Sequence, residues 1–457
     1  MTLIPHGGRP RRRPLQQPTP ETPSPHGTLI KAVRLVTEQA LKGQPVREAL
    51  RLGGRLVAAR FLSVVTLVVA AWLVDIETFA EFGVYQTLAT LAAIALFLRY
   101  DTAIVSARTE AEARDALRFC VCVGLVLWGV FAAAVATAGA AGLMRGALSG
   151  LLPLSILARG ILCLSLALTT RRGDFKGIGR APLLHAAVQP TVLLGLVLSP
   201  VEDVLCFAVA DIAGHATAAA FLTWRRRRVY ADLPRGWSWD TLLSVARRWK
   251  GLPLYNLPGS FFSIAFVMSP LVIMPLAADA VFAGHVALAY RIFDVPTQII
   301  TAASTPIFLN RLRPSRHRAS PVFGRHIMMG LVVLLGLTYA AMAGVLILAD
   351  PWLEGSELAG LSEAVPLVGL FQLFIALGAP LNDSCTLYLQ QKRLVLIQSL
   401  ALAAGAYAAF LAARVSPEAV LAALAVVSAC RALALGELLR KLSSLSRRSF
   451  VEDSLTS

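Results

Sequence analysis

The stretch RFCVCVGLVLWGVFAAAVATAGAA, residues 118–141, carries a charge only at its first position, Arg118. A helix needs about 20 mostly apolar residues to cross the hydrocarbon layer of a membrane, so this stretch predicts a transmembrane helix. The same pattern recurs along the chain. We predict twelve such helices, near residues 54–74, 82–105, 118–141, 148–170, 181–199, 203–223, 252–276, 280–304, 325–349, 364–388, 394–413 and 416–438.

The composition of the 457-residue chain excludes a soluble globule. Hydrophobic residues make up 56% and charged residues only 15%, whereas soluble proteins are about one-quarter charged. The net charge is +16, and the basic residues lie between apolar segments. This distribution is typical of a membrane protein rather than of a nucleic-acid binder. The six cysteines lie within or beside apolar segments, so we expect no disulfide framework, no metal site and no cofactor.

Basic residues fall almost entirely on one side of the predicted membrane. Of the 43 Lys and Arg residues, only Arg145 and Arg414 fall in loops that twelve helices place outside. Because basic loops stay in the cytoplasm, both termini are expected there. The predicted regions are a disordered or amphipathic extension at 1–50, a first six-helix lobe at 51–224, a cytoplasmic linker at 225–251, a second six-helix lobe at 252–440 and a cytoplasmic tail at 441–457.

The loops limit the possible functions. The longest connection between predicted helices, about residues 225–250, is too short for a soluble catalytic domain, and the chain has no nucleotide-binding P-loop motif. A membrane-embedded polysaccharide polymerase or ligase would carry a large outside loop, which the sequence lacks. These features favour a transporter that is not an enzyme and draws its energy from elsewhere.

Four segments carry a family resemblance: DIETFAEFGVYQTLATL (75–91), LRYDTAIV (98–105), TTRRGDFKGIGRAPLL (169–184) and AYRIFDVPTQII (289–300). Together they resemble the O-antigen flippases, polysaccharide exporters of the multidrug/oligosaccharidyl-lipid/polysaccharide (MOP) exporter superfamily. The likeness spans roughly residues 50–440.

The resemblance implies an all-α polytopic membrane protein with two six-helix lobes around a central cavity that opens alternately to each side. It implies a multi-pass protein of the bacterial inner membrane. Its cargo would be a polyprenyl-diphosphate-linked oligosaccharide for lipopolysaccharide or exopolysaccharide export. The expected partners are therefore this lipid-linked oligosaccharide, membrane lipids and polysaccharide assembly proteins, and no nucleic acid. A lipid-linked peptidoglycan precursor flippase and a drug/cation antiporter of the same superfamily stay open as alternatives.

Two arginines lie near the middle of predicted helices, Arg159 in the first half and Arg291 in the second. A charge at mid-membrane costs at least about 2.5–3.5 kcal/mol, so such residues are either functional or paired. The planar guanidinium matches phosphate, which makes both arginines candidate cargo ligands, together with Arg99. The alternatives are that Arg291 pairs with Asp294, three residues away on the same helical face, and that Arg99 reaches the inner surface.

Three further polar residues are candidates for ion coupling: Asp211, His215 one helical turn later, and Asp294. A buried carboxylate can take up a proton or a cation during transport. Alternatively, Asp211 makes only a structural hydrogen bond between helices. We interpret His185 as a structural polar residue and not as a site.

The charge distribution makes a topological prediction. Reporter fusions after Arg228 and at the C-terminus should both report a cytoplasmic location, because the basic loops lie on that side. A periplasmic signal from either fusion would contradict the twelve-helix topology.

Overall fold

The computed structural model describes most of the chain from residue 54 to residue 456. Its gaps are residues 55–57, 59–60, 64, 67–68, 234–236, 313–320, 354–355, 357 and 386–390. Its side chains are described except at 175, 298–329, 331, 380, 383–390 and 441–456. The disordered or amphipathic extension predicted at 1–50 therefore lies outside the described residues.

The described residues are helical and contain no β-strand, which confirms the predicted all-α polytopic membrane fold. Every predicted segment from 82–105 onward overlaps one or more of the described helices. The helices are α3 (Glu77–Ala95), α4 (Asp101–Ser106), α5 (Glu110–Ala140), α6 (Gly146–Arg171), α7 (Phe175–Val197), α8 (Asp203–Arg225), α9 (Arg227–Ala231), α10 (Trp239–Arg248), the π-helix η1 (Leu252–Asn256), α11 (Leu257–Val267), α12 (Ser269–Ala277), α13 (Ala280–Leu312), α14 (Pro321–Leu353), α15 (Leu361–Cys385), α16 (Gln391–Ala412) and α17 (Pro417–Thr456).

Seven described helices are long and apolar enough to cross a membrane: α5, α6, α8, α14, α15, α16 and α17. An eighth span forms if the stretch Leu252–Val267 and helix α12, which meet at a bend of 47°, are taken together. Pro270 lies at this bend, and proline removes a helical hydrogen bond. The described residues of α3, α7 and α13 are not long and apolar enough to meet the same criterion of length and hydropathy. Each of these helices contributes polar side chains to the cavity described below.

The second predicted helix, at 82–105, is broken. Helix α3 ends at Ala95 and α4 begins at Asp101. Between them, Leu98 and Arg99 have φ values of 47° and 64°, a left-handed conformation that non-glycine residues rarely adopt. Arg99 is held there by its Nε, which donates to Asn256 Oδ1 of η1 over 2.9 Å.

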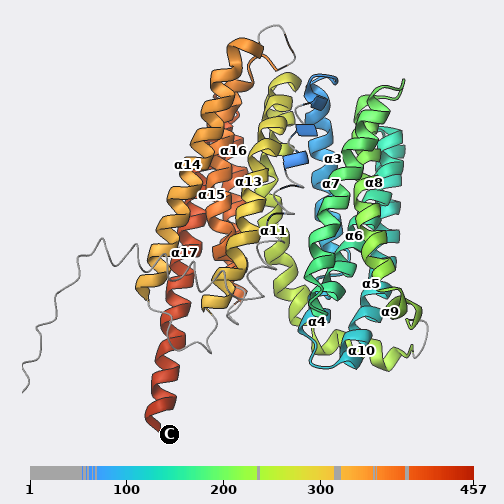
Figure 1. The fold of residues 1–457 in the computed structure, drawn as a ribbon, viewed down its shortest axis with the longest axis vertical. Helices are drawn as coiled ribbons and strands as arrows, with labels where there is room; N and C mark the ends of the chain where they lie inside the picture. Colours follow the sequence, from blue (N-terminus) through green and yellow to red (C-terminus); the bar gives the residue numbers. More distant parts are fainter. Residues whose placement is uncertain are drawn as a thin grey trace, which may run out of the picture. The chain divides into compact units, whose positions relative to one another are not determined.

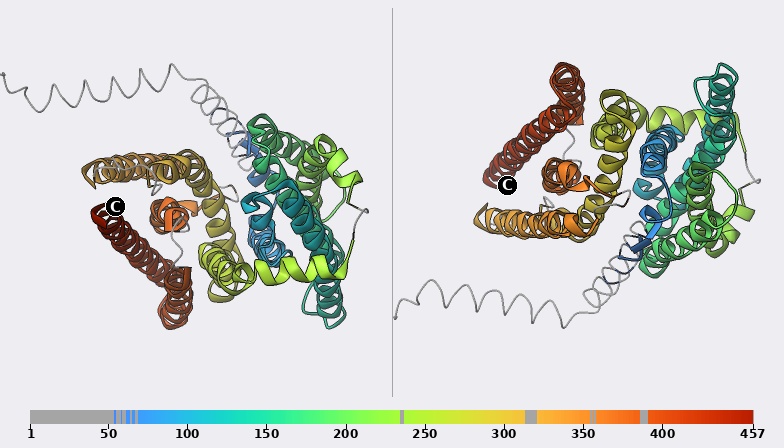
Figure 2. Two further views of the ribbon diagram at one scale, coloured as in Figure 1. Left: turned by 90° about the horizontal axis from the view of Figure 1, so that it is seen from below. Right: turned by 90° about the horizontal axis from the view of Figure 1, so that it is seen from above.

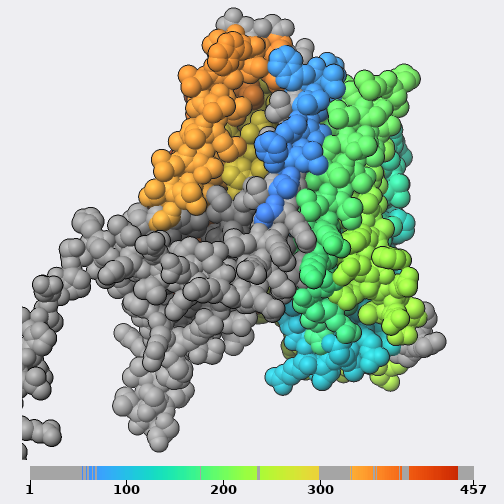
Figure 3. Space-filling model, in the orientation of Figure 1, coloured from blue at the N-terminus to red at the C-terminus, as the bar shows by residue number. Residues whose placement is uncertain are grey.

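The helices form two packed groups, α3–α8 and α11–α17 (Figures 1 and 2). Within the first group, α6 and α7 both pack on α8, and within the second, α15 packs on α13 and α17. The main contacts between the groups run through α3, which packs on α11, α12 and α13. In the space-filling view, the described residues just before α3 and the start of α3 are seen between α14 and α7 (Figure 3).

Small residues allow α3 and α13 to approach closely. An added Cβ at Gly284 of α13 would lie 2.2 Å from the carbonyl oxygen of Ile76, just before α3. On α3, an added Cβ at Gly83 would already touch Leu271 and Ala287 of the other group. Glycine and alanine commonly let membrane helices approach in this way, so this contact depends on Gly284 having no side chain.

Replacing Gly284 by alanine should therefore destabilise the protein. The new methyl group would collide with a backbone carbonyl, and overpacking of this kind costs about 1–3 kcal/mol. We expect a lower midpoint of thermal unfolding for purified Gly284→Ala. Gly336→Ala in α14 is the matched control because an added Cβ there meets nothing within 4 Å. Equal midpoints for the two variants would contradict the proposed close contact.

Candidate functional site

A cavity of about 410 Å³ lies where α3, α6, α7 and α8 face α12 and α13. It brings together Arg159, Asp211, His215, Arg291 and Asp294, which are far apart in the sequence. Two residues from the first predicted helix, Ser63 and Thr66, also line it. The cavity therefore draws its polar side chains from both groups of helices, within segments that are otherwise apolar.

Arg159 of α6 is bound to Asp211 of α8. Its Nη2 donates to both carboxylate oxygens of Asp211, over 2.8 and 2.9 Å. Its Nη1 donates to Thr90 of α3 over 3.2 Å, and Ser155 donates to Asp211 over 3.1 Å. Asp211 is only 1% exposed, so the arginine supplies the counter-charge that a buried carboxylate requires.

Two histidines extend this network. His215 Nδ1 lies 3.4 Å from Asp211 Oδ1, and His185 Nε2 of α7 lies 3.3 Å from His215 Nδ1. One ligand atom from each of His185, Asp211 and His215 lies within 4.8 Å of the others, a spacing that could hold a cation. The charge of Arg159 opposes a metal ion at this position, since the same carboxylate already binds the guanidinium.

Arg291 of α13 has a different environment. Its guanidinium carbon lies 4.3 Å from the centroid of the Phe82 ring and 5.7 Å from that of Phe79, both on α3. These cation–π contacts orient the guanidinium across the contact between the two groups of helices. Within the described part of the chain, its Nε and Nη2 are buried and have no hydrogen-bond acceptor.

The structure does not bring Arg99 to this cavity. Arg99 lies at the break between α3 and α4, where it binds Asn256 and comes within 3.9 Å of Asp101. Conversely, His185 lines the cavity, although the sequence led us to interpret it as structural. A lone histidine in an apolar helix gives little indication of its neighbours, and only the packing of α7 on α8 places it beside His215.

Comparison with known proteins gives the fold a context. No protein-family model matches the sequence, and no curated protein sequence matches it. Solved structures do match. A multidrug resistance MATE family transporter of the MOP superfamily, in an inward-facing conformation, gives a TM-score of 0.60 at 14% identity over 86% of this chain and 96% of that chain. The lipid II flippase MurJ, in an inward closed conformation, gives 0.64 at 12% identity over 89% of this chain and 93% of that chain.

The chain has the fold of MOP-superfamily transporters. A further MATE structure, in the straight conformation, agrees with a TM-score of 0.58 at 14% identity, over 90% of this chain and 98% of that chain. These neighbours are transporters and not enzymes. The protein is thus a multi-pass membrane protein with the fold of these transporters.

The ion pair makes a quantitative prediction. Arg159→Met would leave the buried carboxylate of Asp211 without a counter-charge. Asp211→Asn would likewise leave the guanidinium of Arg159 without one. Breaking a buried pair costs about 3–5 kcal/mol, so each single variant should show reduced membrane abundance and a lower unfolding midpoint.

The double variant Arg159→Met/Asp211→Asn leaves neither charge alone and should recover most of this loss. Arg431→Met is the control, because Arg431 binds Gln398 and Ser263 and does not line the cavity, so its effect should add to that of Asp211→Asn. Additive effects for the Arg159 and Asp211 variants would contradict the pairing.

Proposed function

We propose that this protein is a flippase that moves a polyprenyl-diphosphate-linked oligosaccharide across the bacterial inner membrane by alternating access, for surface polysaccharide export. One observation carries the proposal: Arg291 lines a cavity within the membrane fold, and two of its buried nitrogens, Nε and Nη2, have no hydrogen-bond acceptor among the described residues. Buried donors without acceptors are costly. A ligand with anionic oxygens at this depth would satisfy them.

The contrast between the two cavity arginines assigns them different roles in this proposal. Arg291 is the primary ligand of the diphosphate, since a guanidinium can bind a phosphate group through two parallel hydrogen bonds. Arg159 already binds Asp211, so it contributes only if cargo competes with that carboxylate. Arg99, which lies outside the cavity, would contact cargo only in another conformation.

A drug/cation antiporter is the main competing function on this fold. A cationic drug is best held by a carboxylate without a partner, whereas Asp211 is neutralised by Arg159. An unsatisfied guanidinium repels such a cargo. The cavity holds two arginines and two carboxylates, Asp211 and Asp294. The buried Nε and Nη2 of Arg291, which have no acceptor among the described residues, favour an anionic group on the cargo, which a lipid-linked oligosaccharide and a lipid-linked peptidoglycan precursor share.

We further propose that Asp211, His215 and Asp294 couple transport to an ion gradient. His215 Nδ1 contacts both the Asp211 carboxylate and His185 Nε2, so groups of the types that bind protons or cations lie together at the cavity. Both termini would lie in the cytoplasm, as the positions of the basic loops predict.

The test is transport by Arg291 variants at matched protein levels. Arg291→Ala should lose most flippase activity in a complementation assay, at wild-type membrane abundance. Arg291→Lys keeps the charge but loses the planar fork, so it should retain part of the activity. The loss for alanine should be about tenfold or more, as expected for removing charge-assisted hydrogen bonds worth about 1.5–3 kcal/mol.

Two comparisons distinguish loss of cargo binding from loss of protein stability in the Arg291 variants. Arg431→Ala removes another buried arginine, which binds Gln398 and Ser263 away from the cavity, so its activity should fall only in proportion to its abundance. If Arg291→Ala is scarce and Arg291→Ala/Asp294→Asn recovers both abundance and activity, Arg291 is a structural brace.

The coupling role is tested separately in vesicles. Loss of the gradient dependence of transport in His215→Gln supports this role, and an unchanged gradient dependence contradicts it.

A further inference from the structure

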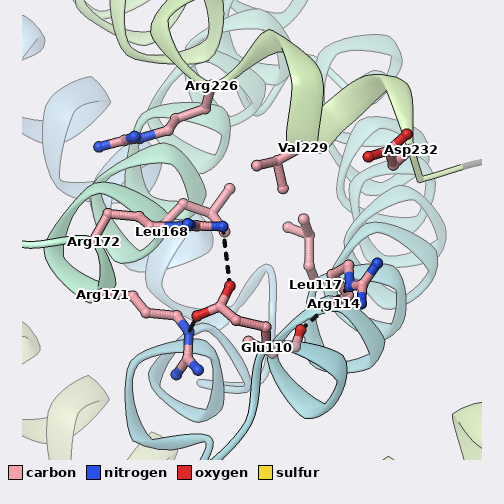
Figure 4. Close-up of a pocket in the computed structure, with 10 residues that line it drawn as sticks. Glu110, Arg114, Leu117, Leu168, Arg171, Arg172, Arg226, Val229 and Asp232 are labelled. Carbon is pink, nitrogen blue, oxygen red and sulfur yellow. Dashed lines mark hydrogen bonds and ion pairs between the residues drawn. The ribbon is translucent and has the colours of Figure 1, made fainter.

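A second pocket lies at the end of the first helix group where the basic loops gather. Its volume is about 270 Å³, far more than one water requires. The start of α5, the end of α6 and the segment around α9 enclose it, with Arg114, Arg171, Arg172 and Arg226 among its lining residues (Figure 4). None of these residues lines the cavity of the proposed transport site.

Two of the charged residues here have structural roles. Glu110 accepts a hydrogen bond from Arg171 Nε over 3.1 Å and lies 3.0 Å from Arg172 Nη2 (Figure 4). The other nitrogens of Arg171 donate to backbone carbonyls of the turn that joins α4 to α5, at residues 104, 107 and 109. Arg171 is therefore fully used in fixing this turn to the end of α6.

The remaining three arginines have N–H donors to spare. Each guanidinium carries five. Among the described residues, Arg172 contacts only Glu110, and Arg114 makes one long hydrogen bond of 3.4 Å to the carbonyl of Glu110. Arg226 donates through Nη2 to Asp174, and its buried Nε has no acceptor. Beside the two carboxylates of the pocket, Glu110 and Asp232, three cationic groups thus offer most of their donors to a ligand with anionic oxygens.

The floor and surroundings of the pocket indicate where such a ligand comes from. Its floor includes the apolar side chains of Leu117, Leu168 and Val229. Exposed tryptophans flank it in the sequence, with Trp224 64% and Trp239 83% exposed, and tryptophan concentrates at the level of lipid headgroups. An apolar floor under cationic walls at this level fits a phosphate group that is attached to an acyl-bearing body.

We propose that this pocket binds the phosphate headgroup of an anionic phospholipid from the leaflet that faces the basic loops. Basic pockets between membrane helices are a common way of binding such headgroups. The bound phosphate takes hydrogen bonds from Arg114, Arg172 and Arg226, and the glycerol and upper acyl carbons lie on the apolar floor. This site is separate from cargo transport and does not depend on the proposed flippase function.

The experiment measures lipid binding to the full-length protein purified in detergent. Short-chain phosphatidylglycerol is titrated and binding is followed by native mass spectrometry. Arg114→Gln/Arg172→Gln should weaken binding about tenfold, as expected for the loss of charge-assisted hydrogen bonds. Arg227→Gln/Arg228→Gln is the matched control, since it removes the same charge from exposed positions in α9 that do not line the pocket. The control should bind like the wild type.

A second variant keeps the test independent of folding defects. Glu110→Gln removes the carboxylate that competes for Arg172 and keeps a hydrogen-bond acceptor, so it should bind phosphatidylglycerol more tightly than the wild type. Phosphatidylcholine and inorganic phosphate are the two comparison probes. Equal binding of inorganic phosphate would mean that the pocket holds the free ion and not a lipid. Equal weakening in the α9 control, or weaker binding by Glu110→Gln, would overturn the proposal.

Discussion

The close approach of α3 to α13 is the contact on which the cavity depends. It joins the two helix groups where Gly284 leaves room for the carbonyl of Ile76. Seven residues after Gly284 on α13, and three and six residues after Ile76 on α3, the same contact places Arg291 over the rings of Phe79 and Phe82. The polar walls of α6, α7 and α8 then face Arg291 across the cavity. A larger residue at 284 would move Arg291 away from these rings.

Desolvation explains why the two cavity arginines differ. Removing a guanidinium from water is tolerated when a carboxylate and further hydrogen bonds replace the lost hydration. Arg159 receives these replacements from Asp211, Thr90 and Ser155. Arg291 receives aromatic faces, which attract the charge but accept no conventional hydrogen bond through Nε or Nη2. The first arginine is therefore suited to hold helices together, and the second to bind an anionic ligand, as the proposed function requires.

The sequence predicted the helices well because their apolar length is a property of each segment alone. It also identified Arg159, Asp211, His215, Arg291 and Asp294 as unusual, since charges in apolar segments are visible without a fold. It did not reveal that Asp211, His215 and Asp294 share a cavity with the two arginines, which depends on contacts such as α8 with α6 and α3 with α13. The break after α3 was equally hidden, because Leu98 and Arg99 carry no glycine or proline signal for a left-handed turn.

Arginine occurs in this protein in several environments, and its partners decide its role in each. Arg171 is saturated by Glu110 and backbone carbonyls and fixes a turn. Arg431 is buried among the neutral partners Gln398 and Ser263 and braces the second group of helices. Where the described residues offer no acceptor, as at Nε of Arg226 and of Arg291, the guanidinium can still bind an anion. Counting arginines in a membrane sequence cannot separate these cases, whereas counting their unsatisfied N–H groups does, because a buried donor without an acceptor is costly enough to require a reason.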